Sequence, residues 1–169
     1  MNKRVKWNHK GMTLVEIILV IAIIGIMAGT AVAMIGHIRY ADTQKTVKAI
    51  DSALDKLQIQ TMSKTGNHYL YIYHLSNGCY MKVLSDNLSS FDAAKLNSDG
   101  TKLANNSVSI YKDSLSGTKV DGNDFIKIAY TKELTFDMTN TNVNAIVVNG
   151  GSSYTLHLFP ETGRHKVDH

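Results

Sequence analysis

Lys10-Gly11-Met12-Thr13-Leu14-Val15-Glu16-Ile17-Ile18-Leu19-Val20 is the stretch that decides how this chain is organised. A basic segment ends at a glycine, and the long apolar run that follows contains one carboxylate, Glu16. A charged side chain near the middle of a bilayer costs about 2.5–3.5 kcal/mol on insertion scales. We therefore expect a partner that compensates the charge of Glu16, and an assembly partner is the best candidate.

The apolar run is long enough to cross a membrane. The residues from Met12 to Gly36 are apolar with three exceptions, and as a helix they measure about 37 Å, which spans a bilayer. The basic residues before Gly11 have no acidic counterpart, so the positive-inside rule places the N-terminus in the cytoplasm. A secretory signal peptide cleaved near Ala31-Val32-Ala33 is the alternative. The length of the run and the pattern beyond Gly36 favour an anchor.

The segment Gly11-Met12-Thr13-Leu14-Val15-Glu16 resembles the class III signal of type IV pilins and type II secretion pseudopilins. The resemblance implies cleavage between Gly11 and Met12 by a prepilin peptidase on the cytoplasmic side, followed by N-methylation of Met12. It also implies that Glu16 of one subunit pairs with the N-terminal amine of its neighbour during filament assembly. Hydration of Glu16 at the membrane edge is the alternative for a single subunit.

The charge balance follows from this division of the chain. The 169 residues include 18 Lys and Arg against 14 Asp and Glu, and four of the basic residues precede Gly11. Cleavage there leaves 14 of each, so the net charge of +4 says little about partners of the mature protein. The length suits one modest domain plus an anchor. Cys79 is the only cysteine, which excludes an intrachain disulfide and favours a small buried apolar role.

Beyond Gly36 the apolar residues Val47, Ile50, Leu54 and Leu57 recur at helical spacing. This pattern predicts an amphipathic helix whose apolar stripe packs on a sheet. The predicted organisation of the chain is therefore a leader at 1–11, a transmembrane and filament-core helix at 12–36, an amphipathic helix at 37–65 and a β head at 66–169.

Within the head the period changes to two, which indicates strands. Strands are predicted at about 68–75 and 79–84, joined by a hairpin at Asn77-Gly78. Ser85 to Leu103 reads as a loop with a short helix near 90–96. Further strands are predicted at 108–111, 125–131, 134–138, 145–148 and 154–159. The predicted fold class is α+β, with a long N-terminal helix packed on a small antiparallel sheet, as in pilins.

The end of the chain, Tyr154 to Val167, is similar to the final hairpin of H-type minor pseudopilins and of minor pilins from natural-transformation systems. This similarity favours a minor subunit over a major one. In DNA-binding minor pilins a Gly-Arg-x-Arg stretch near this point contacts phosphates, and here Gly163-Arg164-His165-Lys166 has Lys in the last position. Arg164 and Lys166 are therefore candidate DNA-binding residues, and a solvated hairpin end is the alternative.

We find no motif for catalysis, no basis for a cofactor and no recognised metal spacing. The seven histidines include His165 and His169, four residues apart, but a helix there is not expected. The stretches Asn97-Ser98-Asp99-Gly100 and Asp121-Gly122-Asn123-Asp124 offer oxygen ligands, yet neither matches an EF-hand loop and both are typical of turns. A membrane-tethered enzyme with an unrecognised site is the remaining alternative class.

The sequence as a whole predicts a structural subunit, not an enzyme, of a type IV pilus or a type II secretion-like filament. Its expected partners are other pilin subunits, the prepilin peptidase, an inner-membrane assembly platform and the membrane itself. It is expected to be a single-pass membrane protein with its head outside before assembly, and part of a surface filament afterwards. A DNA receptor of a natural-transformation (competence) system is the competing interpretation, with DNA as a further partner.

Overall fold

The computed structural model describes residues 13–63 and 65–169, including all their side chains except those of residues 30–35. The predicted leader, the cleavage site at Gly11 and Met12, and the N-methylation site at Met12 lie outside the described residues. The chain divides into two compact units, Met1–Gly36 and His37–His169. Helix α1 (Leu14–Ser63) contributes residues to both units. Residues 14–36 are called its N-terminal half, and residues 37–63 its C-terminal half.

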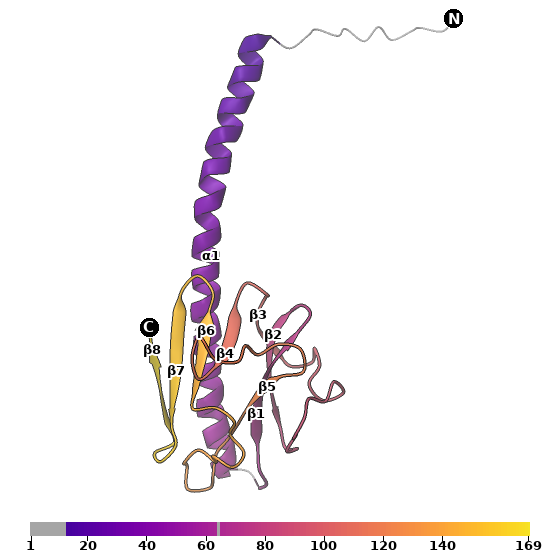
Figure 1. Cartoon of the computed structure of the whole chain (residues 1–169), viewed down its shortest axis with the longest axis vertical. Coiled ribbons are helices and arrows are strands. Elements are labelled where there is room, and N and C mark those ends of the chain that lie inside the picture. Colours follow the sequence, from indigo (N-terminus) through magenta and orange to yellow (C-terminus); the bar gives the residue numbers. More distant parts are fainter. Residues whose placement is uncertain (1–12, 64) are drawn as a thin grey trace, which may run out of the picture. The chain divides into compact units, whose positions relative to one another are not determined.

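The second unit contains the C-terminal half of α1 and two four-stranded antiparallel sheets (Figure 1). Sheet A has the strand order β3-β2-β1-β5 and sheet B the order β4-β6-β7-β8. The strands of sheet A are β1 (Tyr69–Leu75), β2 (Gly78–Leu84), β3 (Thr101–Ala104) and β5 (Phe125–Ala129). The strands of sheet B are β4 (Ser109–Lys112), β6 (Ala145–Asn149), β7 (Ser153–Phe159) and β8 (Arg164–Asp168).

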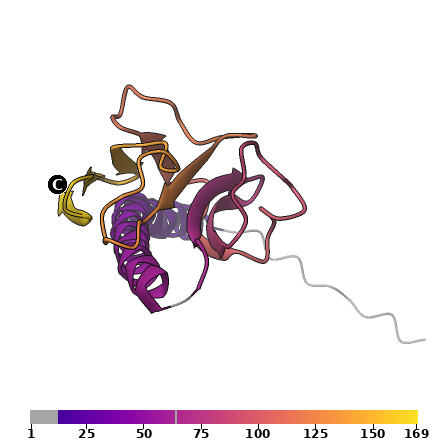
Figure 2. The same ribbon diagram turned by 90° about the horizontal axis from the view of Figure 1, so that it is seen from below.

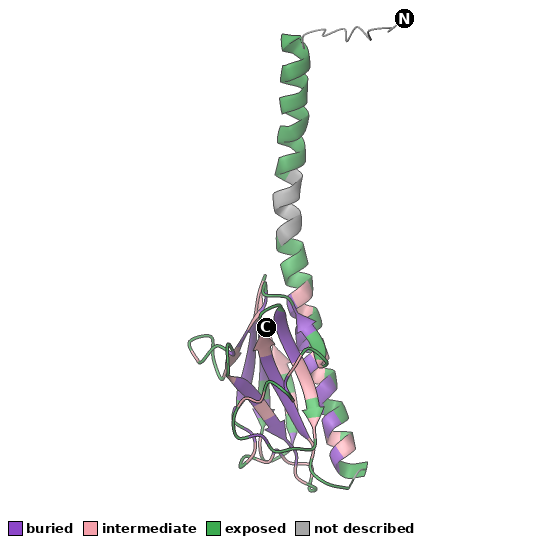
Figure 3. Ribbon diagram, turned by 90° about the vertical axis from the view of Figure 1, so that its right-hand side faces the viewer, coloured by how far each residue is buried: buried purple, intermediate pink, exposed green. Residues whose placement is uncertain are grey.

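The C-terminal half of α1 packs on both sheets through one apolar stripe (Figures 2 and 3). Ile50, Leu54 and Leu57 are fully buried, because their spacing places them on one face of the helix. The same core cluster contains Ile72 of sheet A and Ile146 of sheet B. The head therefore has one main core, in which the helix fills the space that the two sheets leave open.

Strand β1 is buried on both faces because a second cluster covers its other side. Leu70 and Ile72 face the helix, whereas Tyr69, Tyr71 and Tyr73 form an aromatic cluster with Leu96 and others. The Tyr73 hydroxyl donates to the carbonyl oxygen of Asn97 at 2.6 Å, and the Tyr71 hydroxyl accepts from the N–H of Leu88 at 2.8 Å. These bonds hold residues 85–100 as a cover over sheet A and satisfy hydroxyls that would be costly to bury unpaired.

The structure confirms the predicted α+β class and most of the strands, with the β1–β2 hairpin in the predicted place. Position 78 also requires glycine for a steric reason, because a Cβ there would lie 2.1 Å from the carbonyl oxygen of Ala104 on β3. Strand β3 itself was wrongly assigned to a loop, and the head has two sheets where one small sheet was predicted.

Two predicted elements are wrong. The short helix near 90–96 is replaced by a single turn, in which the carbonyl oxygen of Asp92 accepts from the N–H of Leu96, because this segment lies flat over the aromatic cluster. The strand at 134–138 is replaced by turns and one isolated bridge. Leu134 has a φ of 67°, which an extended strand does not allow, and Phe136 instead stacks on Tyr130 with 4.4 Å between ring centroids.

Candidate functional site

Residues 14–29 of α1 are exposed on every side of the helix, as the green ribbon of Figure 3 shows, and most of them are apolar. From Leu14 to Met27 the large apolar residues are 43–73% exposed. A helix that is apolar all round normally lies inside another structure. Contiguous apolar surface of this extent marks a place that another molecule or a membrane covers. In the described part of the chain, no helix has an apolar segment of sufficient length for a membrane crossing.

Glu16 lies in the first turn of α1 and forms a capping box with Thr13. The backbone N–H of Thr13 donates to Glu16 Oε2 at 2.9 Å, and the Thr13 hydroxyl donates to the same oxygen at 3.0 Å. In return, the N–H of Glu16 donates to the Thr13 hydroxyl oxygen at 3.3 Å. These bonds satisfy backbone N–H groups that the start of a helix leaves without partners. The negative charge is also favourable at this end of the helix dipole.

The capping box gives Glu16 a structural role at the start of α1, in addition to any pairing of its charge. A carbonyl oxygen at position 16 is enough for the cap, whereas a partner cation would need the carboxylate. The two roles are therefore separable by substitution. The Thr-x-x-Glu spacing of Thr13 and Glu16 is a readable capping-box signal, and reasoning from the cost of a charge in the membrane overlooked it.

The two candidate DNA-binding residues lie on the same exposed face of β8, the edge strand of sheet B. Strand alternation places Arg164 and Lys166 on this face and His165 on the opposite one. Lys166 Nζ lies 2.7 Å from Asp168 Oδ1, and this hydrogen bond is the main reason that the pKa of Asp168 lies below its ordinary value. The structure therefore brings the two cations together but gives one of them an acidic neighbour.

His165 links the last strand to α1, a contact that sequence reasoning missed. Its side chain is only 10% exposed, and its Nε2 lies 3.1 Å from Asp51 Oδ1 and 3.6 Å from Asp55 Oδ1. His169, which was weighed as its metal-binding companion, instead packs edge-on against the ring of Tyr154. Asp51 and Asp55 are one turn apart on α1, but nothing local in the sequence joins them to residue 165.

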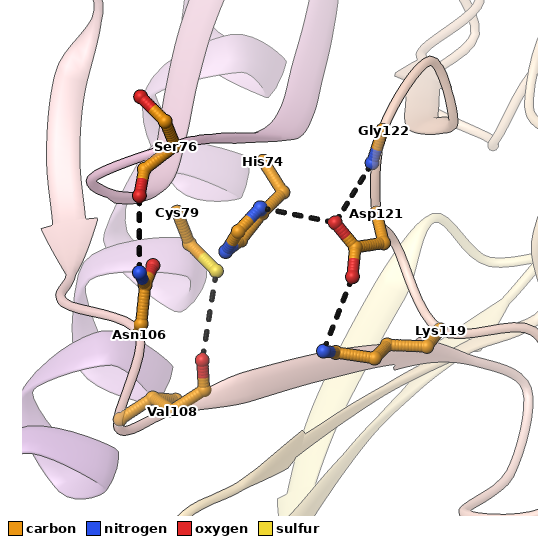
Figure 4. A network of polar contacts seen from close by, with 8 residues as sticks. All are labelled: His74, Ser76, Cys79, Asn106, Val108, Lys119, Asp121 and Gly122. Atoms are coloured by element: carbon orange, nitrogen blue, oxygen red, sulfur yellow. Dashed lines mark hydrogen bonds and ion pairs between the residues drawn. The ribbon is translucent and has the colours of Figure 1, made fainter.

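In the turn at residues 121–124, the carboxylate of Asp121 has its partners within the chain (Figure 4). The Asp121 carboxylate accepts from the N–H of Gly122 at 2.8 Å and lies 3.3 Å from both Lys119 Nζ and His74 Nδ1. The Gly122 bond, followed by Lys119 and His74, holds the pKa of Asp121 below its ordinary value. Among the described residues, no group of three or more His, Cys, Asp or Glu is placed to hold a metal ion.

Cys79 is buried in the main core, as predicted. Its Sγ donates weakly to the carbonyl oxygen of Val108 at 3.7 Å (Figure 4). Burial raises the pKa of this thiol to about 11. The thiol is therefore neutral at physiological pH, and a neutral buried thiol is a poor nucleophile.

The chain thus combines an α+β head with a helical segment that exposes apolar side chains on all sides. Residues 8–32 match the family described as the prokaryotic N-terminal methylation motif. This motif is the signature of type IV pilins and pseudopilins, so the resemblance at Gly11–Glu16 is confirmed. The match covers the start of the chain and leaves the head outside it. No curated protein and no solved structure matches the chain.

The matched motif marks a family of structural filament subunits, not of enzymes. Over these residues the chain is therefore similar to pilins and pseudopilins. In proteins of that family the motif implies processing by a prepilin peptidase and assembly with other pilin subunits.

Proposed function

We propose that the chain is a structural subunit of a type IV pilus or a type II secretion-like pseudopilus, and that it is a minor subunit, which the resemblance of its final hairpin favours. Residues 12–36 anchor the precursor in the membrane, with the N-terminus in the cytoplasm and the head outside. After cleavage between Gly11 and Met12 and methylation of Met12, an inner-membrane platform passes it into a surface filament. The observation that carries this proposal is the all-round exposed apolar helix that begins at a positioned carboxylate.

The role of Glu16 follows from the surroundings it would have in a filament. Apolar helices that bundle together exclude water, and a buried carboxylate without a cation is then costly. The amine that cleavage creates at Met12 of a neighbouring subunit supplies that cation. Thr13 contributes by holding the carboxylate at the end of the helix. The charge pair then selects the relative position of neighbouring helices.

The test compares Glu16→Gln with Glu16→Ala in cells that assemble the native filament. Gln keeps an oxygen for the capping box but lacks the charge, so the two variants separate the cap from the ion pair. Both should insert into the membrane and be cleaved. Both should lose incorporation by about a hundredfold or more, since removing one member of a buried ion pair costs about 3–5 kcal/mol. The measurement is the amount of subunit in sheared filaments relative to the membrane.

Two results would contradict the proposal. Normal incorporation of Glu16→Gln would remove the charge pair from the mechanism and leave only the cap. Mass spectrometry of the mature chain should find methylated Met12 as the first residue. A mature protein that keeps its first eleven residues, or that begins beyond Ala33, would exclude the filament function itself.

Binding of DNA is a second proposed function, favoured by the exposure of Arg164 and Lys166 on one face of β8. Binding would be weak, independent of base sequence and steeply dependent on salt. The ion pair of Lys166 with Asp168 gives a specific expectation. Arg164→Ala should weaken binding more than Lys166→Ala, and Asp168→Asn should strengthen it. Absence of duplex binding by the full chain at low salt would exclude this function.

A further inference from the structure

The outward face of the C-terminal half of α1 carries charges in a definite order. Lys45 and Lys48 are exposed, and neither forms an ion pair with a carboxylate of residues 37–63 or 65–169. Asp51 and Asp55 follow, with 43% and 64% of their side chains exposed. Within the same described range, His165 is the side chain that lies within ion-pair distance of these aspartates.

These four residues share one side of the helix. At 3.6 residues per turn they fall within an arc of about 120°, on the side away from the buried stripe of Ile50 and Leu54. A surface helix whose charges only solvate its outer face mixes the two signs along its length. Here Lys45 and Lys48 come first and Asp51 and Asp55 follow, with the exposed Lys56 at the edge of the same arc. The arc is therefore complementary to a displaced copy of itself.

The spacing fixes the displacement. Lys45 and Asp51 are six residues apart, or about 9 Å along the helix, and Lys48 and Asp55 are seven apart, or about 10.5 Å. A parallel second copy shifted by about 10 Å toward the C-terminal end of α1 brings its two lysines level with the two aspartates of the first. Its own aspartates then lie level with residues 57–62, which contain no acidic residue. One displacement thus makes both pairs without a like-charge contact between carboxylates.

We propose that this face is a contact between successive copies of the chain, with Lys45 and Lys48 of one head against Asp51 and Asp55 of the next. The proposal rests on the proposed function, because anchored subunits with their heads on the same side are parallel. An antiparallel pair would instead place Lys48 opposite Asp51. The contact requires at least two successive copies, whether the chain forms the whole filament or a short run within it.

Charge reversal tests the contact in the full chain, in cells that assemble the native filament. Lys48→Asp and Asp55→Lys should each lower incorporation by about tenfold, because like charges opposite each other across an interface are strongly unfavourable. The double variant Lys48→Asp with Asp55→Lys should recover incorporation to near that of the unmodified chain. Glu161→Lys is the control, since it reverses the charge of an exposed residue in the β7–β8 turn, outside α1. Protease resistance of each head shows that the variants are folded.

Each outcome of the charge-reversal experiment supports or overturns the proposed contact. Recovery by the Lys48–Asp55 double reversal supports the parallel contact. Recovery only by Lys48→Asp with Asp51→Lys would overturn it in favour of an antiparallel pair. If the single reversals incorporate as well as the control, the contact is overturned while the filament function stands. If the unmodified chain is not cleaved before Met12 and not found in filaments, the proposed function fails first, and this contact fails with it.

Discussion

The two halves of α1 differ in where their apolar side chains find cover. In the C-terminal half, Ile50 and Leu54 are buried by both sheets of the same chain. In the N-terminal half, side chains such as Ile21 and Ile24 remain more than half exposed. One half therefore completes the core of the head, whereas the described apolar side chains of the other half stay uncovered. Under the proposed function, folding and assembly depend on different stretches of one helix, so substitutions should separate them.

The largest expected effect is loss of head stability on truncation of the buried stripe. Leu54→Ala should lower the free energy of unfolding by about 2–5 kcal/mol, because it removes buried methyl groups and leaves a cavity. Ile21→Ala, the matched change in the other half, should leave the head as stable as before. Denaturant unfolding of the full chain in detergent, followed by the near-ultraviolet signal of the tyrosines, measures both. Equal losses in the two variants would show that the halves of α1 are not independent.

Glycine substitutions sharpen the same comparison with a smaller effect. A Cβ at Gly151, in the β6–β7 turn, would lie 2.5 Å from the backbone nitrogen of Tyr40 on α1, whereas a Cβ at Gly25 has no atom within 4 Å. Gly151→Ala should therefore destabilise the head by about 1–3 kcal/mol through overpacking. Gly25→Ala should leave the head unchanged and favour the helix by about 1 kcal/mol. A head that tolerates Gly151→Ala would mean that the turn and α1 are not in contact.

Local periodicity is what made much of this molecule predictable. The spacing of Val47, Ile50, Leu54 and Leu57 identified the buried stripe, because a helix repeats its face every 3.6 residues whatever it packs against. Alternation identified β1 and β2 in the same way. Glu16 is proposed as an assembly residue from its position in an apolar run, which is also a local property.

Contacts between distant segments are what the pattern could not predict. β3 has four residues, of which Thr101 and Lys102 are exposed, so its apolar signal is too short to distinguish it from a loop. The segment 134–138 has strand-like composition, but Leu134 has a positive φ and Phe136 stacks on Tyr130. The contact of His165 with Asp51 joins opposite ends of the head. Each depends on which segments meet in space, and one sequence without that knowledge does not specify it.

A smaller loss of head stability is expected when the segment 85–100, which covers sheet A, loses a hydrogen bond. Tyr73→Phe removes the hydroxyl that donates to the carbonyl oxygen of Asn97, and one such hydrogen bond contributes about 0.5–1.5 kcal/mol. The head should lose stability by about this amount, and hydrogen exchange should rise first in residues 85–100. Tyr111→Phe, on β4, is the control for loss of a half-buried hydroxyl elsewhere. Faster exchange in β6 instead of 85–100 would show that Tyr73 does not hold the cover.

The smallest expected effect is the pH dependence of head stability that comes from Asp121. Asp121 has its partners within the head, whereas the proposed partner of Glu16 belongs to another subunit. The pKa of Asp121 is lowered in the folded head (Figure 4), so its contribution to stability is complete above the pKa of the unfolded chain. It declines as the pH falls below about 4 toward the lowered folded value. Asp121→Asn should therefore be less stable than the unmodified chain at neutral pH, by a small margin because the pair with Lys119 is solvent-exposed. Unfolding midpoints measured from about pH 7 to about pH 2.5 should converge, and a gap that persists in acid would assign the effect to the shape of the turn instead of the charge.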